Sequence, residues 1–161
     1  MKTIPRLTLA AALVFAFSAC AKKDPHAGHD HSTHKHDHEH KAPHGGTAVV
    51  LGKEAFHLEL VRDAAAGKLT AYVLDGEMEN FIRLKAAAFE VAVTSGSAPR
   101  RLTFQPVANS ATGETVGDTS QFEASADWLK TTTAFDATLV SLEIRGTTFA
   151  AVAFNFPKGN E

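Results

Sequence analysis

The sequence has little cysteine and no excess of positive charge, and each shortage excludes a class of protein. Cys20 is the single cysteine among 161 residues, so a disulfide framework and a multi-thiolate metal site within one chain are both excluded. The formal net charge is −2, which argues against a nucleic-acid-binding protein, because such proteins carry a basic patch. Histidine is abundant by contrast, and eight of the nine histidines lie between residues 26 and 44.

Long hydrophobic runs are also missing, apart from one near the N-terminus. Residues 7–17 are apolar at all but one position, and they follow a short stretch that contains Lys2 and Arg6. A basic stretch followed by a short apolar run is typical of a secretory signal, and this run is too short for a permanent membrane span. No later segment is apolar enough to cross a membrane. The sequence therefore predicts export from the cytoplasm.

The four residues that follow the apolar run, 17–20, read FSAC. They resemble the lipobox of bacterial lipoproteins, in which the cysteine is lipidated and becomes the mature N-terminus. The resemblance implies a lipoprotein signal peptide at residues 1–19 and attachment to the lipid bilayer through lipidated Cys20, since two or three acyl chains anchor a protein stably. By the sorting rule of that family, Ala21 implies the outer membrane, facing the periplasm. A secreted protein cut near Ala19 is the alternative.

The segment 21–44 reads AKKDPHAGHDHSTHKHDHEHKAPH and has no aliphatic side chain larger than alanine. It cannot bury enough surface to offset the entropy lost on ordering, so residues 20–44 are expected to be a disordered tether that begins with the lipidated cysteine. Eight imidazoles in nineteen residues are typical of metal binding. The predicted metal ligands of this tract are His26, His29, His31, His34, His36, His38, His40 and His44.

The shortage of sulfur narrows the choice of metal. Soft ions such as Cu(I) prefer methionine and cysteine, and Met78 is the one methionine after the predicted signal. Imidazole suits divalent transition metals, so zinc is the first choice, with Cu(II) and Ni(II) as alternatives. Two other interpretations of the tract stay open. It could be a solvated linker, or a pH-responsive tether whose imidazoles gain charge in acid.

From residue 45 onward, short alternating runs of apolar and polar residues are broken by Gly, Asp, Asn and Ser, which is the strand pattern. This pattern favours an all-β fold over residues 45–161. The first choice is an antiparallel β-sandwich, Ig-like in the broad sense, and a small β-barrel is the alternative. One helical turn is expected at 126–130 and a long polar loop at 108–120. Strands are expected at 47–51, 55–62, 68–75, 80–84, 88–94, 101–107, 121–124, 136–145 and 148–156.

Three short motifs follow one another at the start of this domain: HGG at 44–46, HLEL at 57–60 and YVLD at 72–75. The series, which covers residues 43–76, resembles small periplasmic proteins associated with heavy-metal efflux and related segments of the adaptor subunits of such pumps. The resemblance implies a His-rich periplasmic lipoprotein. It also implies a metal-transport or efflux component as partner.

The same motifs suggest a second, ordered metal site. His57 and Glu59 share one strand face, and His44 lies just before the strand expected at 47–51. If that strand pairs with 55–62, all three side chains could converge on one ion, and such a nitrogen and oxygen set suits zinc or Cu(II). Alternatively, His57 and Glu59 are solvent-facing strand residues that form a cross-strand pair.

No pattern in the sequence indicates catalysis. Neither a nucleophile elbow nor a glycine-rich phosphate loop is present, so an enzyme is not expected. The expected function is that of a membrane-anchored periplasmic metal-binding lipoprotein that buffers, sequesters or delivers a divalent transition metal in metal homeostasis or resistance. The alternative is a tethered β-sandwich module for protein interaction in the cell envelope, with the His tract as a spacer or a pH-responsive linker.

Overall fold

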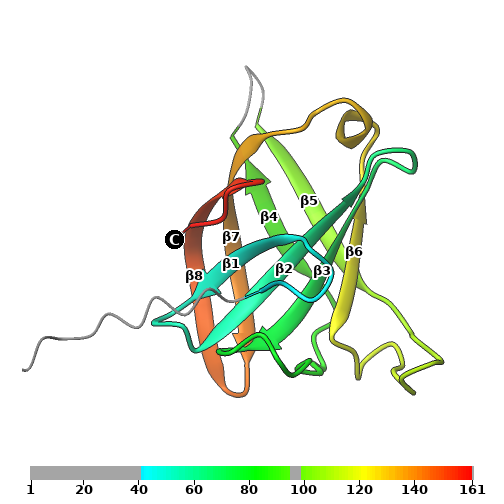
Figure 1. Ribbon diagram of the computed structural model, residues 1–161, viewed down its shortest axis with the longest axis vertical. Helices are drawn as coiled ribbons and strands as arrows, with labels where there is room; N and C mark the ends of the chain where they lie inside the picture. Colours follow the sequence, from blue (N-terminus) through cyan, green and yellow to red (C-terminus); the bar gives the residue numbers. More distant parts are fainter. Residues whose placement is uncertain (1–40, 95–98, 161) are drawn as a thin grey trace, which may run out of the picture. The chain divides into compact units, whose positions relative to one another are not determined.

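The computed structural model describes residues 41–94 and 99–160, which belong to the unit His38–Glu161. The described region consists of antiparallel strands and one short 3-10 helix, η1, so the predicted all-β fold is confirmed (Figure 1). The elements are β1 (Thr47–Leu51), β2 (Phe56–Asp63), β3 (Lys68–Asp75), β4 (Phe89–Val93), β5 (Arg100–Pro106), β6 (Gln121–Ser125), η1 (Asp127–Lys130), β7 (Phe135–Ile144) and β8 (Thr147–Phe156).

The strands form a single sheet in the order β1-β2-β3-β6-β5-β4-β7-β8, which curls until it is nearly closed. Of the two predicted arrangements, the barrel describes this sheet. The segment after β8 lies along β1 at the seam: the Asn160 side chain bonds to both the N–H and the carbonyl of Val50, at 2.8 and 3.1 Å. A Cβ added at Gly159 would lie 2.3 Å from the Ala48 carbonyl oxygen, so glycine is needed there. The C-terminal segment thereby covers part of the open edge.

Eight of the nine predicted strands are present, with ends within one residue of those expected. The exception is 80–84, where isolated bridges at Phe81 and Leu84 replace a strand. The side chains of this segment nevertheless alternate between two faces. Ile82 and Leu84 point into the core, whereas Phe81 and Arg83 point outward. The predicted helical turn at 126–130 is η1.

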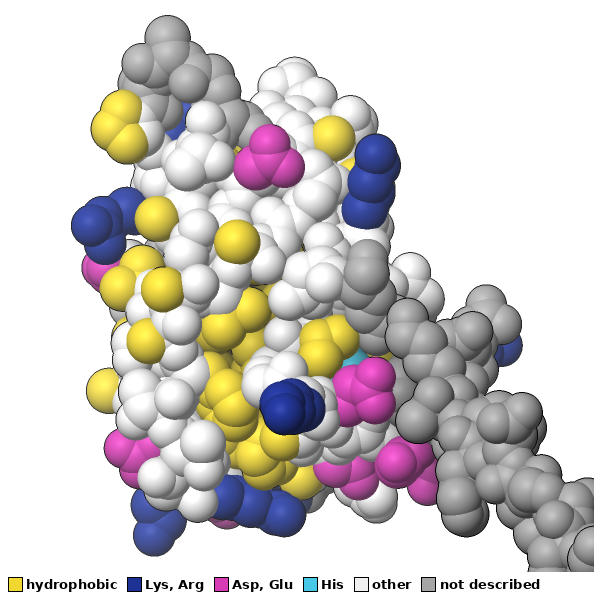
Figure 2. Space-filling view, turned by 90° about the vertical axis from the view of Figure 1, so that its left-hand side faces the viewer, with side chains coloured by type: hydrophobic (Ala, Val, Ile, Leu, Met, Phe, Trp, Pro, Cys, Tyr) yellow, Lys and Arg dark blue, Asp and Glu magenta, His cyan; other side chains and the backbone are white. Residues whose placement is uncertain are grey.

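Alternate residues of each strand fill the interior, as the period of two requires. Aromatic rings contribute much of the core: Phe89 stacks on Phe104 with 4.8 Å between ring centroids, and Phe135 stacks on Phe156 at 5.2 Å. On the side of the molecule that carries β8, hydrophobic side chains also show at the surface within a hollow (Figure 2).

Several predictions concern residues outside the described ranges. They are the signal peptide at 1–19, the lipidated Cys20, and the tract ligands His26 to His40. Among the described residues, no helix is long and apolar enough to span a membrane.

Candidate functional site

The HGG segment in front of β1 folds back over the outer face of β2. Gly45 adopts a left-handed conformation with φ +68°, and its N–H donates to the Ala42 carbonyl at 3.0 Å. A Cβ on Gly46 would lie 2.7 Å from the Leu60 carbonyl oxygen and 2.8 Å from Cγ of Glu59. Glycine is therefore required at position 46, because the backbone there lies directly against β2.

The carboxylate of Glu59 receives this segment. Glu59 points to the outer face of the sheet, yet it is fully buried. Its Oε1 accepts hydrogen bonds from the backbone N–H groups of His44 and Gly46, at 2.7 and 2.9 Å. Its Oε2 lies 2.8 Å from Nδ1 of the His44 ring. One buried carboxylate thus holds both the backbone and the side chain of His44, the residue that ends the predicted tether.

Aromatic rings hold His44 from a second direction. The His44 ring stacks on Tyr72 with centroids 4.0 Å apart and planes 16° apart, and Phe81 is tilted against it at 5.7 Å. Tyr72 pairs with Glu59 across β2 and β3. Burial of the phenol and the charges of Glu59 and Glu123 raise the pKa of Tyr72, and Lys68 offsets part of this. We refer to His44, Glu59, Tyr72 and Phe81 as the His44 cluster.

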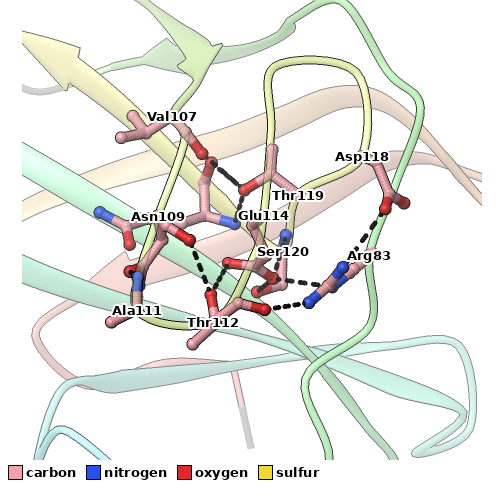
Figure 3. Close-up of polar contacts among 10 residues, drawn as sticks. Arg83, Val107, Asn109, Ala111, Thr112, Glu114, Asp118, Thr119 and Ser120 are labelled. Carbon is pink, nitrogen blue, oxygen red and sulfur yellow. Dashed lines mark hydrogen bonds and ion pairs between the residues drawn. The ribbon is translucent and has the colours of Figure 1, made fainter.

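A second polar cluster surrounds the buried carboxylate of Glu114 (Figure 3). Oε1 of Glu114 accepts from the N–H and the hydroxyl of Ser120, at 3.1 and 2.7 Å. Oε2 accepts from the Thr112 hydroxyl at 3.1 Å. Nε of Arg83 lies 3.5 Å from Oε1, and the same guanidinium pairs with Asp118 at 3.3 Å and donates to the Thr112 carbonyl. We refer to Arg83, Thr112, Glu114, Asp118 and Ser120 as the Arg83 cluster.

These bonds give the polar loop at 108–120 a defined form. Isolated bridges join Asn109 to Glu114 and Thr115 to Asp118, so the segment folds into consecutive tight turns. Thr119 adds a hydrogen bond from its hydroxyl to the Val107 carbonyl at 2.7 Å. Sequence reasoning expected a loop here but missed its role as part of a pocket.

Residues from both clusters line one pocket of about 290 Å³ on the outer face of β3 and β6, although Glu59 and Asp118 lie outside its lining. This volume lies just below the range for ligand sites, which is about 300–1,000 Å³. The lining combines stacked rings with amide, hydroxyl and guanidinium groups, so it suits a small ligand or side chain with one flat face and one polar edge. The lining residues are His44, Tyr72, Phe81, Arg83, Asn109, Thr112, Glu114, Ser120 and Gln121.

The predicted convergence of His44, His57 and Glu59 is met only in part. His44 and Glu59 are in contact, as the pairing of β1 with β2 led us to expect. His57 is fully buried, and its Nδ1 lies 3.2 Å from the Asp75 carbonyl, at the turn that ends β3. In residues 41–94 and 99–160, no three His, Cys, Asp or Glu side chains gather as a metal-binding group. His57 does not join His44 and Glu59, because its ring is directed to the turn at Asp75.

Together, these observations describe an all-β domain with one nearly closed antiparallel sheet and a pocket of aromatic and polar residues on its outer face. No protein-family model, curated protein or solved structure matches the chain.

Proposed function

We propose that the protein is a membrane-anchored periplasmic lipoprotein that buffers, sequesters or delivers a divalent transition metal, with zinc ahead of Cu(II) and Ni(II). One observation carries the proposal: eight histidines lie between residues 26 and 44, and the last of them belongs to the folded domain. Neutral imidazoles at this density bind borderline divalent ions, and short loops between ligands cost little entropy.

The anchor and the partner belong to the same proposal. The FSAC sequence at residues 17–20 supports lipidation of Cys20 and an outer-membrane location that faces the periplasm. The HGG and HLEL motifs support a metal-transport or efflux component as the partner that receives or supplies the ion. A binding role is favoured over an enzymatic one, because the polar groups of the Arg83 cluster are used in bonds to one another.

The test uses residues 20–161 with Cys20→Ser, which carry neither the predicted signal nor an acyl chain. Zinc binding is measured by calorimetry and equilibrium dialysis. In the variant, glutamine replaces the seven tract histidines from His26 to His40. We expect the native tract to bind more than one zinc ion and the variant to lose most of this binding. A matched control replaces Asp24, Asp30, Asp37 and Glu39 with their amides. Because it keeps every imidazole, it should retain most of the binding. Equal binding by the native chain and the seven-histidine variant would contradict the proposal.

A second function is favoured by the pocket itself. Stacked rings beside hydrogen-bonding groups are typical of recognition sites, so the domain could be a tethered interaction module for which the tract is a spacer. The seven-histidine variant separates the two functions. A metal-handling protein loses its activity in this variant, whereas an interaction module keeps its partner and loses it when pocket residues such as Phe81 are changed.

A further inference from the structure

Three aromatic rings form one wall of the pocket on the outer face of β3 and β6. The centroids of Tyr72 and Phe81 lie 6.1 Å apart with their planes inclined at 64°, and His44 stacks on Tyr72 at 4.0 Å. All three rings line the pocket, and Phe81 is 46% exposed. The faces of Phe and Tyr rings carry partial negative charge, so this wall attracts flat groups and cations.

Hydrogen-bond acceptors lie beside these rings. Gln121 pairs with Tyr72 across β3 and β6, and it also lines the pocket. Its Nε2 donates to the Glu123 carboxylate at 3.2 Å, so its carbonyl oxygen is left as an acceptor. The phenol oxygen of Tyr72 can accept as well. A ligand that lies against the rings therefore meets acceptors at its edge.

The cationic side chains around the pocket are already paired. Arg83 lies 3.3 Å from the carboxylate of Asp118 and 3.5 Å from that of Glu114 (Figure 3). Lys68 lies 3.0 Å from the carboxylate of Glu123. An anionic ligand would have to compete with these carboxylates for its cation, so the pocket is poorly suited to an anion.

The behaviour of Tyr72 indicates a negative potential in the same place. Burial is the main cause of its raised pKa, and the charges of Glu59 and Glu123 raise the pKa further. Lys68 offsets only part of this effect. A potential that opposes a phenolate favours a positive charge beside the ring.

We propose that the pocket binds a guanidinium group, presented as the arginine side chain of a partner protein. A guanidinium is a flat cation that stacks on aromatic faces and directs N–H donors outward in its plane, whereas an ammonium is a compact point charge. The volume of about 290 Å³ suits the end of one side chain better than a larger ligand. The inference rests on the second function, that of an interaction module, and is independent of metal binding.

The test is an NMR titration of the metal-free soluble chain with Nα-acetylarginine amide. Tyr72 is the one tyrosine of the chain, so its ring signals are assigned without ambiguity. The control ligand is Nα-acetylcitrulline amide, in which a neutral, flat urea replaces the guanidinium. We expect the arginine probe to shift the Tyr72 signals and to bind about tenfold more tightly than the citrulline probe, because only a cation gains from the rings and the negative potential.

A pair of variants tests the aromatic wall. Phe81→Leu keeps an apolar side chain but removes the ring, so it should weaken the arginine probe by about three- to tenfold. Val140→Ala shortens another exposed apolar side chain, on β7 and outside the pocket lining, and should leave the affinity unchanged. Both substitutions change exposed side chains, and the amide NMR spectrum shows whether each variant is folded.

The outcomes are distinguishable. Equal affinity for the arginine and citrulline probes would overturn the inference, as would an unchanged affinity in Phe81→Leu. Free arginine identifies the source of the group: binding no tighter than that of the blocked probe supports a partner's side chain, and tighter binding contradicts it in favour of the free amino acid. If neither arginine compound shifts the Tyr72 signals, this inference is wrong, while the zinc titration still decides the metal-binding function.

Discussion

Two buried glutamates, Glu59 and Glu114, each hold a side chain that lines the same pocket, and they differ in what that side chain can still contact. Glu59 and Glu114 each accept hydrogen bonds from backbone N–H and from side chains. The difference lies in the partner. Glu114 meets an arginine whose other nitrogens are bonded to Asp118 and Thr112, whereas Glu59 meets a histidine ring that keeps one accessible edge.

This difference shows that a buried carboxylate alone does not identify a functional site. In the Arg83 cluster the donors and acceptors engage one another, so the cluster ties the turns of 108–120 to the rest of the pocket. In the His44 cluster, the contact with Glu59 uses Nδ1 of the imidazole, and the partly exposed ring can still contact a ligand in the pocket. Substitutions in the first cluster should change stability alone, and substitutions in the second should also change metal affinity.

The largest effect is expected from removing either carboxylate. Glu114→Ala leaves the N–H of Ser120 and several side-chain donors without their acceptor, so we expect a loss of about 3 kcal/mol in unfolding free energy. Glu59→Ala should cost about as much. Denaturant unfolding measures both. Zinc affinity should fall only for Glu59→Ala, and an equal fall for Glu114→Ala would erase the distinction between the clusters.

A smaller effect separates two glycines. Gly46→Ala places a Cβ 2.7 Å from a backbone oxygen, so we expect a loss of about 2–3 kcal/mol and displacement of His44 from Glu59. Gly113→Ala, at φ +70° in open space, should cost about 1 kcal/mol through its backbone conformation alone. Thermal unfolding and zinc titration of both chains provide the check. Weakened zinc binding in Gly113→Ala would show that the two glycines are not distinguished by the site.

The pH dependence of Tyr72 gives a third comparison. Tyr72 is the one tyrosine of the chain, so ultraviolet absorbance reports its ionisation alone. Burial and Glu59 raise its pKa, so the folded state keeps the phenol proton where the unfolded state has lost it. This stabilisation is complete below the ordinary pKa of about 10 and is lost as the pH rises through the higher pKa of the folded state.

Glu59→Gln should move the pKa of Tyr72 back toward the ordinary value, because it removes the nearby negative charge. Glu114→Gln should leave the pKa where it is, since Glu114 is not among the charges that shift it. An identical response to both substitutions would contradict the assignment of Tyr72 to the His44 cluster.

The smallest effect is expected at the rim of the Arg83 cluster. Asp118 pairs with Arg83 at 3.3 Å, but its side chain is 53% exposed. An exposed ion pair contributes about 0–1 kcal/mol, so Asp118→Asn should change the unfolding free energy by less than about 1 kcal/mol. Denaturant unfolding of the Asp118→Asn and Glu114→Ala variants, measured side by side, compares their losses in unfolding free energy. A loss as large as that of Glu114→Ala would place the stabilising contact at Asp118 instead.

Much of the secondary structure could be predicted from the sequence, because the alternation of apolar and polar residues along a strand is a local property. Eight strands and the helical turn could be located from period and turn residues alone. The order of the strands in the sheet could not be predicted, since the pairing of β3 with β6 joins segments that are far apart in the chain. At 80–84 the alternation was correct and the strand prediction was wrong, because the segment forms only isolated bridges with β3 and Thr119.

The part of the site that lies on two strands adjacent in sequence could be predicted from the sequence. The expected pairing of 47–51 with 55–62 brings the HGG segment to Glu59, and the structure has this contact. No period or motif links Arg83 to Glu114, which lies 31 positions further along the chain, so that contact could not be predicted. His57 shares the outer face of β2 with Glu59, but the direction of its ring depends on the turn at Asp75.

The most direct test of the account is a zinc titration of the native soluble chain, followed by nitrogen NMR of the histidine rings. We predict that zinc shifts the ring nitrogen signals of His44 together with those of the other tract histidines. Zinc that fills the tract while both His44 ring nitrogens keep their metal-free signals would contradict the account.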